Sequence, residues 1–225
     1  MGTDARKRIR SAVRDLRVAA LKPLEPVYRR LKHSPVSGVL RLPPLLWLRR
    51  RLVPGMSATD VLDVLDTLER GGVPCWLVGG WGVDALVGRQ TRRHPDVDVA
   101  IDRRFLASAL SALAATGFQT VHHDLLPAWM PRLIILRDAR RRWVELMPVD
   151  VPEPAPGEDG RPESMRFRYD DDSITTGTVG GRSVRCLAAP VQLLFHSKYA
   201  PRANDRHDVR VLTERFRLPA PAGYS

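Results

Sequence analysis

Two aspartates separated by one residue, Asp96 and Asp98, are the side chains best suited to bind a metal ion. In a β-strand, residues two apart project to the same face, so the two carboxylates lie side by side with Val97 and Val99 buried behind them. Adjacent carboxylates repel each other unless a cation lies between them. Magnesium prefers hard oxygen ligands, keeps several waters and takes substrate phosphates as further ligands. The pair therefore predicts a magnesium site.

A diglycine lies about fifteen residues before these aspartates, directly after an apolar run. Glycine has no Cβ, so its backbone can approach a phosphate closely. A helix is expected to open here, and a helix N-terminus favours an anion. Arginines between the diglycine and the aspartates add charge-assisted contacts to a triphosphate, and an aromatic ring beside the diglycine can stack on a base or sugar. The expected nucleotide-binding residues are Gly79, Gly80, Trp81, Arg89, Arg92 and, near the C-terminus, Lys198.

A third acid is expected, because phosphoryl transfer to a hydroxyl requires a group that takes the hydroxyl proton or binds a second metal. Glu145 is the candidate: it lies between apolar residues in a strand-like run, where a lone acid needs a reason. Asp150, at the end of that run, is the second choice. The predicted catalytic residues are therefore Asp96, Asp98 and Glu145.

Each motif taken singly also has a structural explanation. A D-x-D can be a solvated strand end, a diglycine can be only a turn, and Trp81 can be a packing residue. Near the C-terminus, Asp205 is expected to cap the last helix. His207 and Asp208 can equally be surface residues. It is the order of strand, diglycine, short helix, basic segment and D-x-D strand within about 25 residues that favours a site.

Apolar periodicity and turn residues predict an α+β fold, with helices packed mainly on one side of a small mixed sheet. The expected helices are 57–70, 81–87, 105–115, 190–199 and 205–216. The expected strands are 75–78, 97–101, 118–122, 133–136, 143–147, 174–179 and 183–187. Residues 150–172 are rich in Pro, Gly and acids and are expected to form a loop.

The net charge of +11 belongs to one end of the chain. Residues 1–55 contain 14 Lys or Arg and three Asp or Glu, whereas the remainder is balanced. Repeated prolines interrupt any long helix in this part. We therefore expect a basic N-terminal extension over 1–55 and a compact domain, which carries the acids and the diglycine, over 56–225. Three interpretations of the extension stay open: contact with an anionic membrane surface, contact with nucleic-acid phosphates, or a solvated arm.

No apolar run is long enough for a membrane-spanning helix, and the N-terminus lacks a secretory signal pattern. The two cysteines, Cys75 and Cys186, are far apart and have no ligand-like spacing. These observations predict a cytoplasmic protein, or one peripheral at the membrane through its basic extension.

The central segment resembles the signature of the aminoglycoside 2''-O-adenylyltransferases, within the polymerase-β-like nucleotidyltransferases that also include lincosamide nucleotidyltransferases. The resemblance is densest over residues 76–101, resumes at 181–186 and from Lys198 to Asp208, and loosely covers 57–215. It does not extend to the basic extension. The residues that carry it are Gly79 to Leu86, Gly88, Arg89, Thr91, Arg92, His94, Asp96, Val97 and Asp98.

The resemblance implies the fold, a magnesium–ATP donor and transfer of AMP to a hydroxyl of a small molecule. By position, Asp96 and Asp98 match the metal ligands, and Glu145 falls where relatives place a third carboxylate, often Asp. Many superfamily members have Ser after the diglycine, whereas the aminoglycoside subgroup shares Trp81. The acceptor does not carry over, although acids in the 150–172 loop would suit a cationic aminoglycoside-like antibiotic.

Three other readings are open at this stage. The D-x-D also occurs in glycosyltransferases that grip a sugar nucleotide through manganese, but that leaves the diglycine helix and Glu145 without a role. The basic extension fits a toxin-like nucleotidyltransferase acting on tRNA. It also fits a non-catalytic, membrane-associated module.

Overall fold

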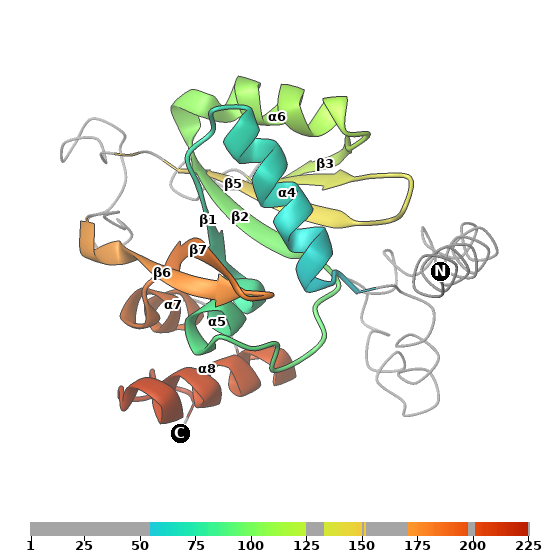
Figure 1. The fold of residues 1–225 in the computed structure, drawn as a ribbon. Coiled ribbons are helices and arrows are strands. Elements are labelled where there is room, and N and C mark those ends of the chain that lie inside the picture. Colours follow the sequence, from blue (N-terminus) through green and yellow to red (C-terminus); the bar gives the residue numbers. More distant parts are fainter. Residues whose placement is uncertain (1–54, 125–132, 150, 152–170, 198–200, 225) are drawn as a thin grey trace, which may run out of the picture. The chain divides into compact units, whose positions relative to one another are not determined.

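Figure 1 shows the computed structural model of the chain, in which the described residues are 55–124, 133–149, 151, 171–197 and 201–224. The predictions for the basic extension, for most of the 150–172 loop, for Asp150 and for Lys198 lie outside these residues. Every element discussed below belongs to one unit, formed by Met56–Asp138 and Trp143–Ser225.

The described elements follow the predicted order. The helices are α4 (Ala58–Arg70), α5 (Gly79–Val87), α6 (Leu106–Ala115), α7 (Ala189–His196) and α8 (Ala203–Phe216), with short 3-10 turns η3 (Arg103–Phe105) and η5 (Asp171–Ser173). The strands are β1 (Cys75–Val78), β2 (Val97–Asp102), β3 (Gln119–Asp124), β4 (Leu133–Arg137), β5 (Trp143–Val149), β6 (Ile174–Val179) and β7 (Arg182–Leu187).

The seven strands form one mixed sheet in the order β3-β4-β5-β2-β1-β7-β6. The strand β2 lies at its centre, antiparallel to β1 and parallel to β5. In this register Asp98 is paired with Val78 on one side and with Glu145 on the other. The mixed sheet confirms the predicted α+β class, and its register brings the predicted acids together from segments about 50 residues apart in sequence.

Alternation along the strands separates two apolar layers. One face presents residues such as Leu77, Val99 and Leu146, which belong to the main core cluster together with residues of α4 and α6 (Figure 1). The opposite face presents Trp76 and Ala100, against which α7 residues pack. The sequence predicted that the helices pack mainly on one side of the sheet. Helix α7 instead covers part of the opposite face, which carries Asp98 and Glu145.

Two helices begin two residues earlier than the sequence predicted, whereas the other helix starts differ by one residue. Helix α5 begins at Gly79 rather than at Trp81, so the diglycine forms its first turn instead of a preceding loop. Helix α8 begins at Ala203, and Asp205 is not its N-cap: the Asp205 carboxylate accepts a hydrogen bond of 2.8 Å from the backbone N–H of Arg202. Asp205 still stabilises the helix start, but from the third helical position.

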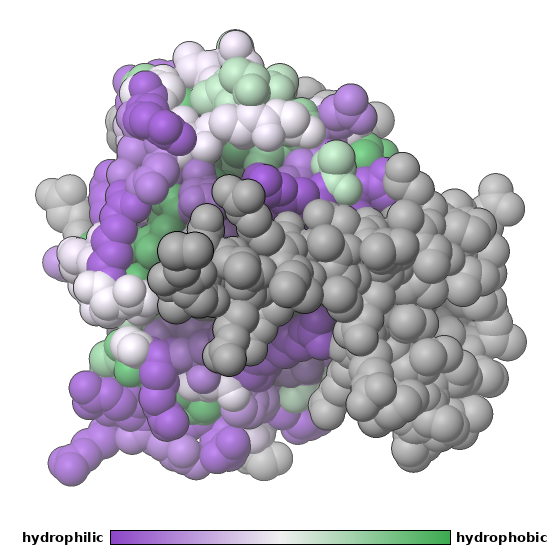
Figure 2. All heavy atoms as spheres, turned by 45° about the vertical axis from the view of Figure 1, so that its right-hand side comes forward, coloured by the Kyte–Doolittle hydropathy of each residue, from purple (hydrophilic) through white to green (hydrophobic). Residues whose placement is uncertain are grey.

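Within the described residues, no helix has both the length and the apolar character needed to cross a bilayer. The surface visible in Figure 2 is mainly hydrophilic, with only scattered apolar groups among the described residues. The large apolar side chains that are well exposed in this part of the chain are Val121, Leu194 and Phe216. They come from three separate elements, β3, α7 and α8.

Candidate active site

Three acids meet where β2 and β5 lie side by side. Asp98 and Glu145 occupy paired positions on these parallel strands, and their carboxyl groups are joined by a hydrogen bond. Such a bond requires a proton on one of the two groups. Asp96 lies just before β2, and its charge acts on Asp98. The structure thus pairs Asp98 with Glu145 and places Asp96 within electrostatic range of Asp98.

This crowding raises the pKa of the Asp98 carboxyl group well above its ordinary value. Burial is the largest cause, because desolvation disfavours the charged form. The negative charges of Asp96 and Glu145 and the hydrogen bond with Glu145 raise it further, and the Arg92 guanidinium opposes the change. The group therefore holds a proton more tightly than an ordinary carboxyl does, unless a cation replaces it.

The chemistry of this cluster fits a hard divalent cation. Among the described residues, no three ligand-type side chains are already arranged as a closed metal site. Magnesium does not require one, since it commonly binds through one or two carboxylates, several waters and the phosphates of a substrate. Asp96 and Asp98 would supply the carboxylates, because a cation between them would offset their mutual repulsion.

The diglycine lies directly against this cluster. Gly79 has a φ of +57°, which favours glycine, and a Cβ at this position would overlap the Asp98 carboxylate. A Cβ at Gly80 would overlap the side chains of Arg92 and His94. Both glycines therefore allow a close approach that a Cβ would prevent. The opening turn of α5 lies beside the Asp98 carboxylate and beside the Arg92 guanidinium.

Arg92 is held by an acid from the far end of the chain. Its Nε and Nη2 donate to the two carboxylate oxygens of Asp208 in α8, at 2.7 Å and 2.6 Å. Burial alone would lower the pKa of Arg92, but the bond to Asp208 and the charges of Asp208, Asp84 and Asp96 raise it above its ordinary value. The guanidinium therefore lies within electrostatic reach of the metal-site acids.

A second polar network was not anticipated from the sequence. His94 Nε2 lies 2.5 Å from one oxygen of the buried Asp84 carboxylate, and the other oxygen accepts hydrogen bonds from the Thr91 backbone N–H and hydroxyl, at 3.0 Å and 2.5 Å. Thr91 Oγ1 is in turn 3.1 Å from Nε2 of His207 in α8. The signal that could have revealed it is Asp84 itself, an acid inside an apolar helix.

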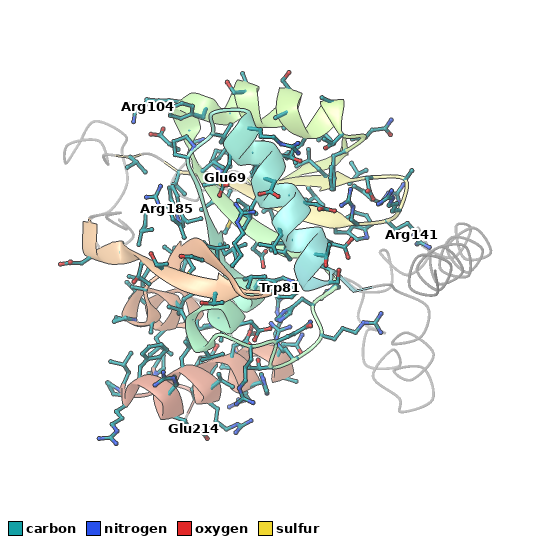
Figure 3. The ribbon with its side chains drawn as sticks, viewed as in Figure 1. Glu69, Trp81, Arg104, Arg141, Arg185 and Glu214 are labelled. Carbon is teal, nitrogen blue, oxygen red and sulfur yellow. The ribbon has the colours of Figure 1, made fainter. Side chains whose placement is uncertain are left out.

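The remaining predicted nucleotide ligands are placed differently. Trp81, labelled in Figure 3, is 2% exposed, and its ring lies 4.9 Å from that of His94, centre to centre. This burial supports a packing role for the indole rather than a stacking contact with a base. Arg89 is exposed at the end of α5.

His196 is buried in α7. Its backbone carbonyl accepts a hydrogen bond of 3.1 Å from the Tyr224 hydroxyl. Burial lowers the pKa of its imidazole, although the charges of Asp208 and Asp205 oppose this. The imidazole therefore favours the neutral form, and α7 is tied to the end of the described chain.

Replacing Gly79 by Ala tests the close approach to Asp98. Gly88 ends the same helix with a φ of +74° and has open space where a Cβ would lie, so Gly88→Ala shares the backbone strain without the overlap. We expect Gly88→Ala to cost about 1 kcal/mol of unfolding free energy, and Gly79→Ala to cost about 1–3 kcal/mol more. Denaturant unfolding measures both. Equal losses would show that the overlap with Asp98 has no cost.

Replacing Asp98 by Asn tests the crowding of the acids. Because the folded-state pKa of Asp98 is raised, the folded state binds its proton more tightly than the unfolded state does. The free energy of unfolding therefore falls as pH rises from the ordinary pKa of 3.8 through the raised value. Without divalent metal, and above that window, Asp98→Asn should unfold at a higher temperature than the native chain and show a weaker pH dependence.

Differential scanning calorimetry with a chelator present measures these unfolding temperatures and their pH dependence, and Asp66→Asn in α4 is the control. A variant less stable than the native chain at about pH 8 would contradict the repulsion.

Comparison with known proteins agrees with this geometry. A lincosamide resistance protein from Staphylococcus haemolyticus is 29% identical over 157 residues, which are 70% of this chain and 94% of that protein. A 2''-aminoglycoside nucleotidyltransferase from Escherichia coli is 25% identical over 133 residues, which are 58% of this chain and 67% of that protein.

Solved structures show the same fold. The lincomycin-bound lincosamide antibiotic adenylyltransferase LnuA matches with a TM-score of 0.58 at 25% identity, over 71% of this chain and 98% of that one. The complex of ANT(2'')-Ia with adenylyl-2''-tobramycin matches with a TM-score of 0.55 at 17% identity, over 71% and 88%. A family model described as aminoglycoside-2''-adenylyltransferase matches residues 60–212. The chain therefore belongs to the aminoglycoside-2''-adenylyltransferase family and is a nucleotidyltransferase.

Proposed function

We propose that this chain transfers AMP from magnesium–ATP to a hydroxyl group of an antibiotic, with Asp96, Asp98 and Glu145 as the catalytic residues. The observation that carries the proposal is the pairing of Asp98 with Glu145 on adjacent strands, directly beside Gly79. A metal-binding acid, a proton-accepting acid and a glycine backbone that admits phosphate are the groups that nucleotidyl transfer needs, and here they are adjacent.

On the donor side, Asp96 and Asp98 would hold magnesium, which when bound supplies positive charge to the phosphates and offsets the repulsion between the acids. Gly79 and Gly80 present the opening backbone of α5 to the triphosphate, and the helix N-terminus favours its charge. The Arg92 guanidinium beside Gly80 adds charge-assisted hydrogen bonds. Lys198 and Arg89 stay as predicted contributors.

On the acceptor side, Glu145 is placed to act as the general base. A Glu145 carboxylate oxygen takes the proton as the acceptor oxygen bonds to the α-phosphorus, and the bond from that phosphorus to pyrophosphate breaks. In the metal-free state the hydrogen bond between Glu145 and Asp98 requires one shared proton. Once that proton has left the pair, both groups are carboxylates and Glu145 can accept the proton of the substrate hydroxyl.

We propose a lincosamide as the first acceptor to test. The lincosamide resistance protein is matched over 94% of its length and LnuA over 98%, whereas the aminoglycoside enzyme from E. coli is matched over 67%. An aminoglycoside is the second candidate, because the matching family model is described by that activity. Membership of this family favours nucleotidyl transfer over the glycosyltransferase alternative. The three interpretations of residues 1–55 stay open.

Conservative substitutions separate the roles of the acids. Asp98→Asn should weaken binding of magnesium–ATP and lower turnover by more than about a hundredfold, because even outer-shell metal contacts are worth 10–100-fold. Glu145→Gln should lower turnover by about 10²–10⁴-fold and leave nucleotide affinity nearly intact. Asp66→Asn, at a carboxylate that pairs with Arg182 on the surface, is the control. Calorimetric titration and product assay measure both quantities; full turnover by Asp98→Asn would refute the metal assignment.

A panel of acceptors tests the substrate class. With radiolabelled ATP and magnesium, we expect label on lincomycin, and at lower or equal efficiency on tobramycin, with none on bulk tRNA. The Asp98→Asn variant run in parallel identifies label that does not depend on this site. Transfer to tRNA alone would overturn the antibiotic assignment and favour the basic extension as a nucleic-acid contact.

A further inference from the structure

One ion pair joins the last helix to the nucleotide side of the site. Asp208 in α8 binds both Nε and Nη2 of Arg92, which lies 116 residues earlier in the chain. The Asp208 side chain is 2% exposed and that of Arg92 is 18% exposed. The pair is bidentate, which fixes the plane of the guanidinium as well as its position. Arg92 is therefore held at one edge and partly open to solvent at another.

The guanidinium held in this way points at the proposed phosphate site. Its Nη2 lies so close to Gly80 that a Cβ there would overlap it. Its charge also lowers the pKa of Asp98, and the charge of Asp96 raises the pKa of Arg92. Arg92 thus lies between the opening turn of α5 and the metal-site acids, where an incoming triphosphate would meet it.

The ion pair leaves part of Arg92 available. A guanidinium has five N–H donors, and the pair with Asp208 uses one on Nε and one on Nη2. A further contact, from Nη1 to the Arg93 carbonyl, is long at 3.4 Å. Donors are therefore left for a phosphate, in a direction that Asp208 determines.

A neighbouring contact shows that α8 docks on this segment at two adjacent points. His207 precedes Asp208 and lies 3.1 Å from the hydroxyl of Thr91, which precedes Arg92. Thr91 is itself bonded to Asp84 in α5. The segment that carries Arg92 is thus fixed between α5 and α8, so its geometry depends on the closing helix.

We propose that Asp208 is a positioning residue for nucleotide binding: it aligns the Arg92 guanidinium with the phosphates of ATP and so makes the docked α8 part of the donor site. The proposal rests on the proposed function, because it takes the triphosphate to bind at Gly79, Gly80 and Arg92. Asp208 itself does not touch the nucleotide. Its effect passes through Arg92 alone.

Asp208→Asn tests the proposal, because the amide keeps the shape of the carboxylate and loses its charge. We expect the Kd for magnesium–ATP to rise about tenfold or more, because Arg92 is no longer aligned for its charge-assisted contact with the phosphates. The kcat at saturating ATP should change far less. The control is Asp205→Ala, on the same helix, which removes the carboxylate that accepts a hydrogen bond from the Arg202 backbone N–H. It should lower the unfolding temperature and leave the Kd unchanged.

A double-mutant cycle distinguishes alignment of Arg92 from general support of the fold. In an Arg92→Gln background, Asp208→Asn should change the Kd by less than about twofold, because the two changes remove the same contact. Arg92→Lys is a second variant: it keeps the charge but cannot form the bidentate pair, and should also weaken binding about tenfold. Native affinity in Arg92→Lys, or additive effects in the cycle, would overturn the proposal.

The same titrations distinguish this inference from the proposed function. If the native chain binds no magnesium–ATP, the proposed donor site is wrong and the role of Asp208 is wrong with it. If the native chain binds and Asp208→Asn binds equally well, only the positioning role is wrong. Isothermal titration of magnesium–ATP, with calorimetric unfolding of every variant, gives both answers without an acceptor.

Discussion

The repulsion between carboxyl groups at the junction of β2 and β5 is the constraint around which this structure is arranged. Asp98 and Glu145 are paired across parallel strands, and Asp96 adds its charge from the residue just before β2. Three acids this close remain together only if a proton or a cation offsets their charge. The strands themselves are held by a well-packed apolar layer on their other face, which includes Val97, Val99 and Leu146. Core packing thus holds in place a cluster that would otherwise separate.

The groups around the cluster limit this repulsion without removing it. Arg92 lowers the pKa of Asp98, but its Nε and Nη2 donate their hydrogen bonds to the carboxylate of Asp208. Gly79 lets the backbone of α5 lie against the Asp98 carboxylate, at a position where a Cβ would overlap that group. The metal-free site therefore has a deficit of positive charge next to a helix N-terminus. A nucleotide that arrives with its own divalent cation matches that deficit, whereas a nucleotide alone would add to the repulsion.

Sequence reasoning found the parts of the site that are local and missed those that are not. Asp96 and Asp98 follow from spacing, and Glu145 stands out as an acid in an apolar run, so all three could be proposed as site residues without a structure. The strand order could not, because periodicity shows which residues face a core but not which strands are neighbours. For Trp81 the sequence left both stacking on the nucleotide and packing open, and the contact with the His94 ring, which supports packing, depends on the tertiary structure. The pairs of Asp208 with Arg92 and of Asp84 with His94 are products of tertiary packing.

The charge of the Asp208–Arg92 pair is difficult to explain by stability alone. Removing an acid and a guanidinium from water costs several kcal/mol per ion, and a well-packed apolar pair of similar size is often as stabilising or more so. Helix α8 already packs through Val209 and Leu212 against Val83 of α5, so apolar contacts are enough to dock it. A charged pair at the border of that interface is useful if the guanidinium has a second partner. Its place beside Gly80 and the start of α5 fits the proposed triphosphate as that partner. The last helix then contributes to the binding of substrate as well as to the fold.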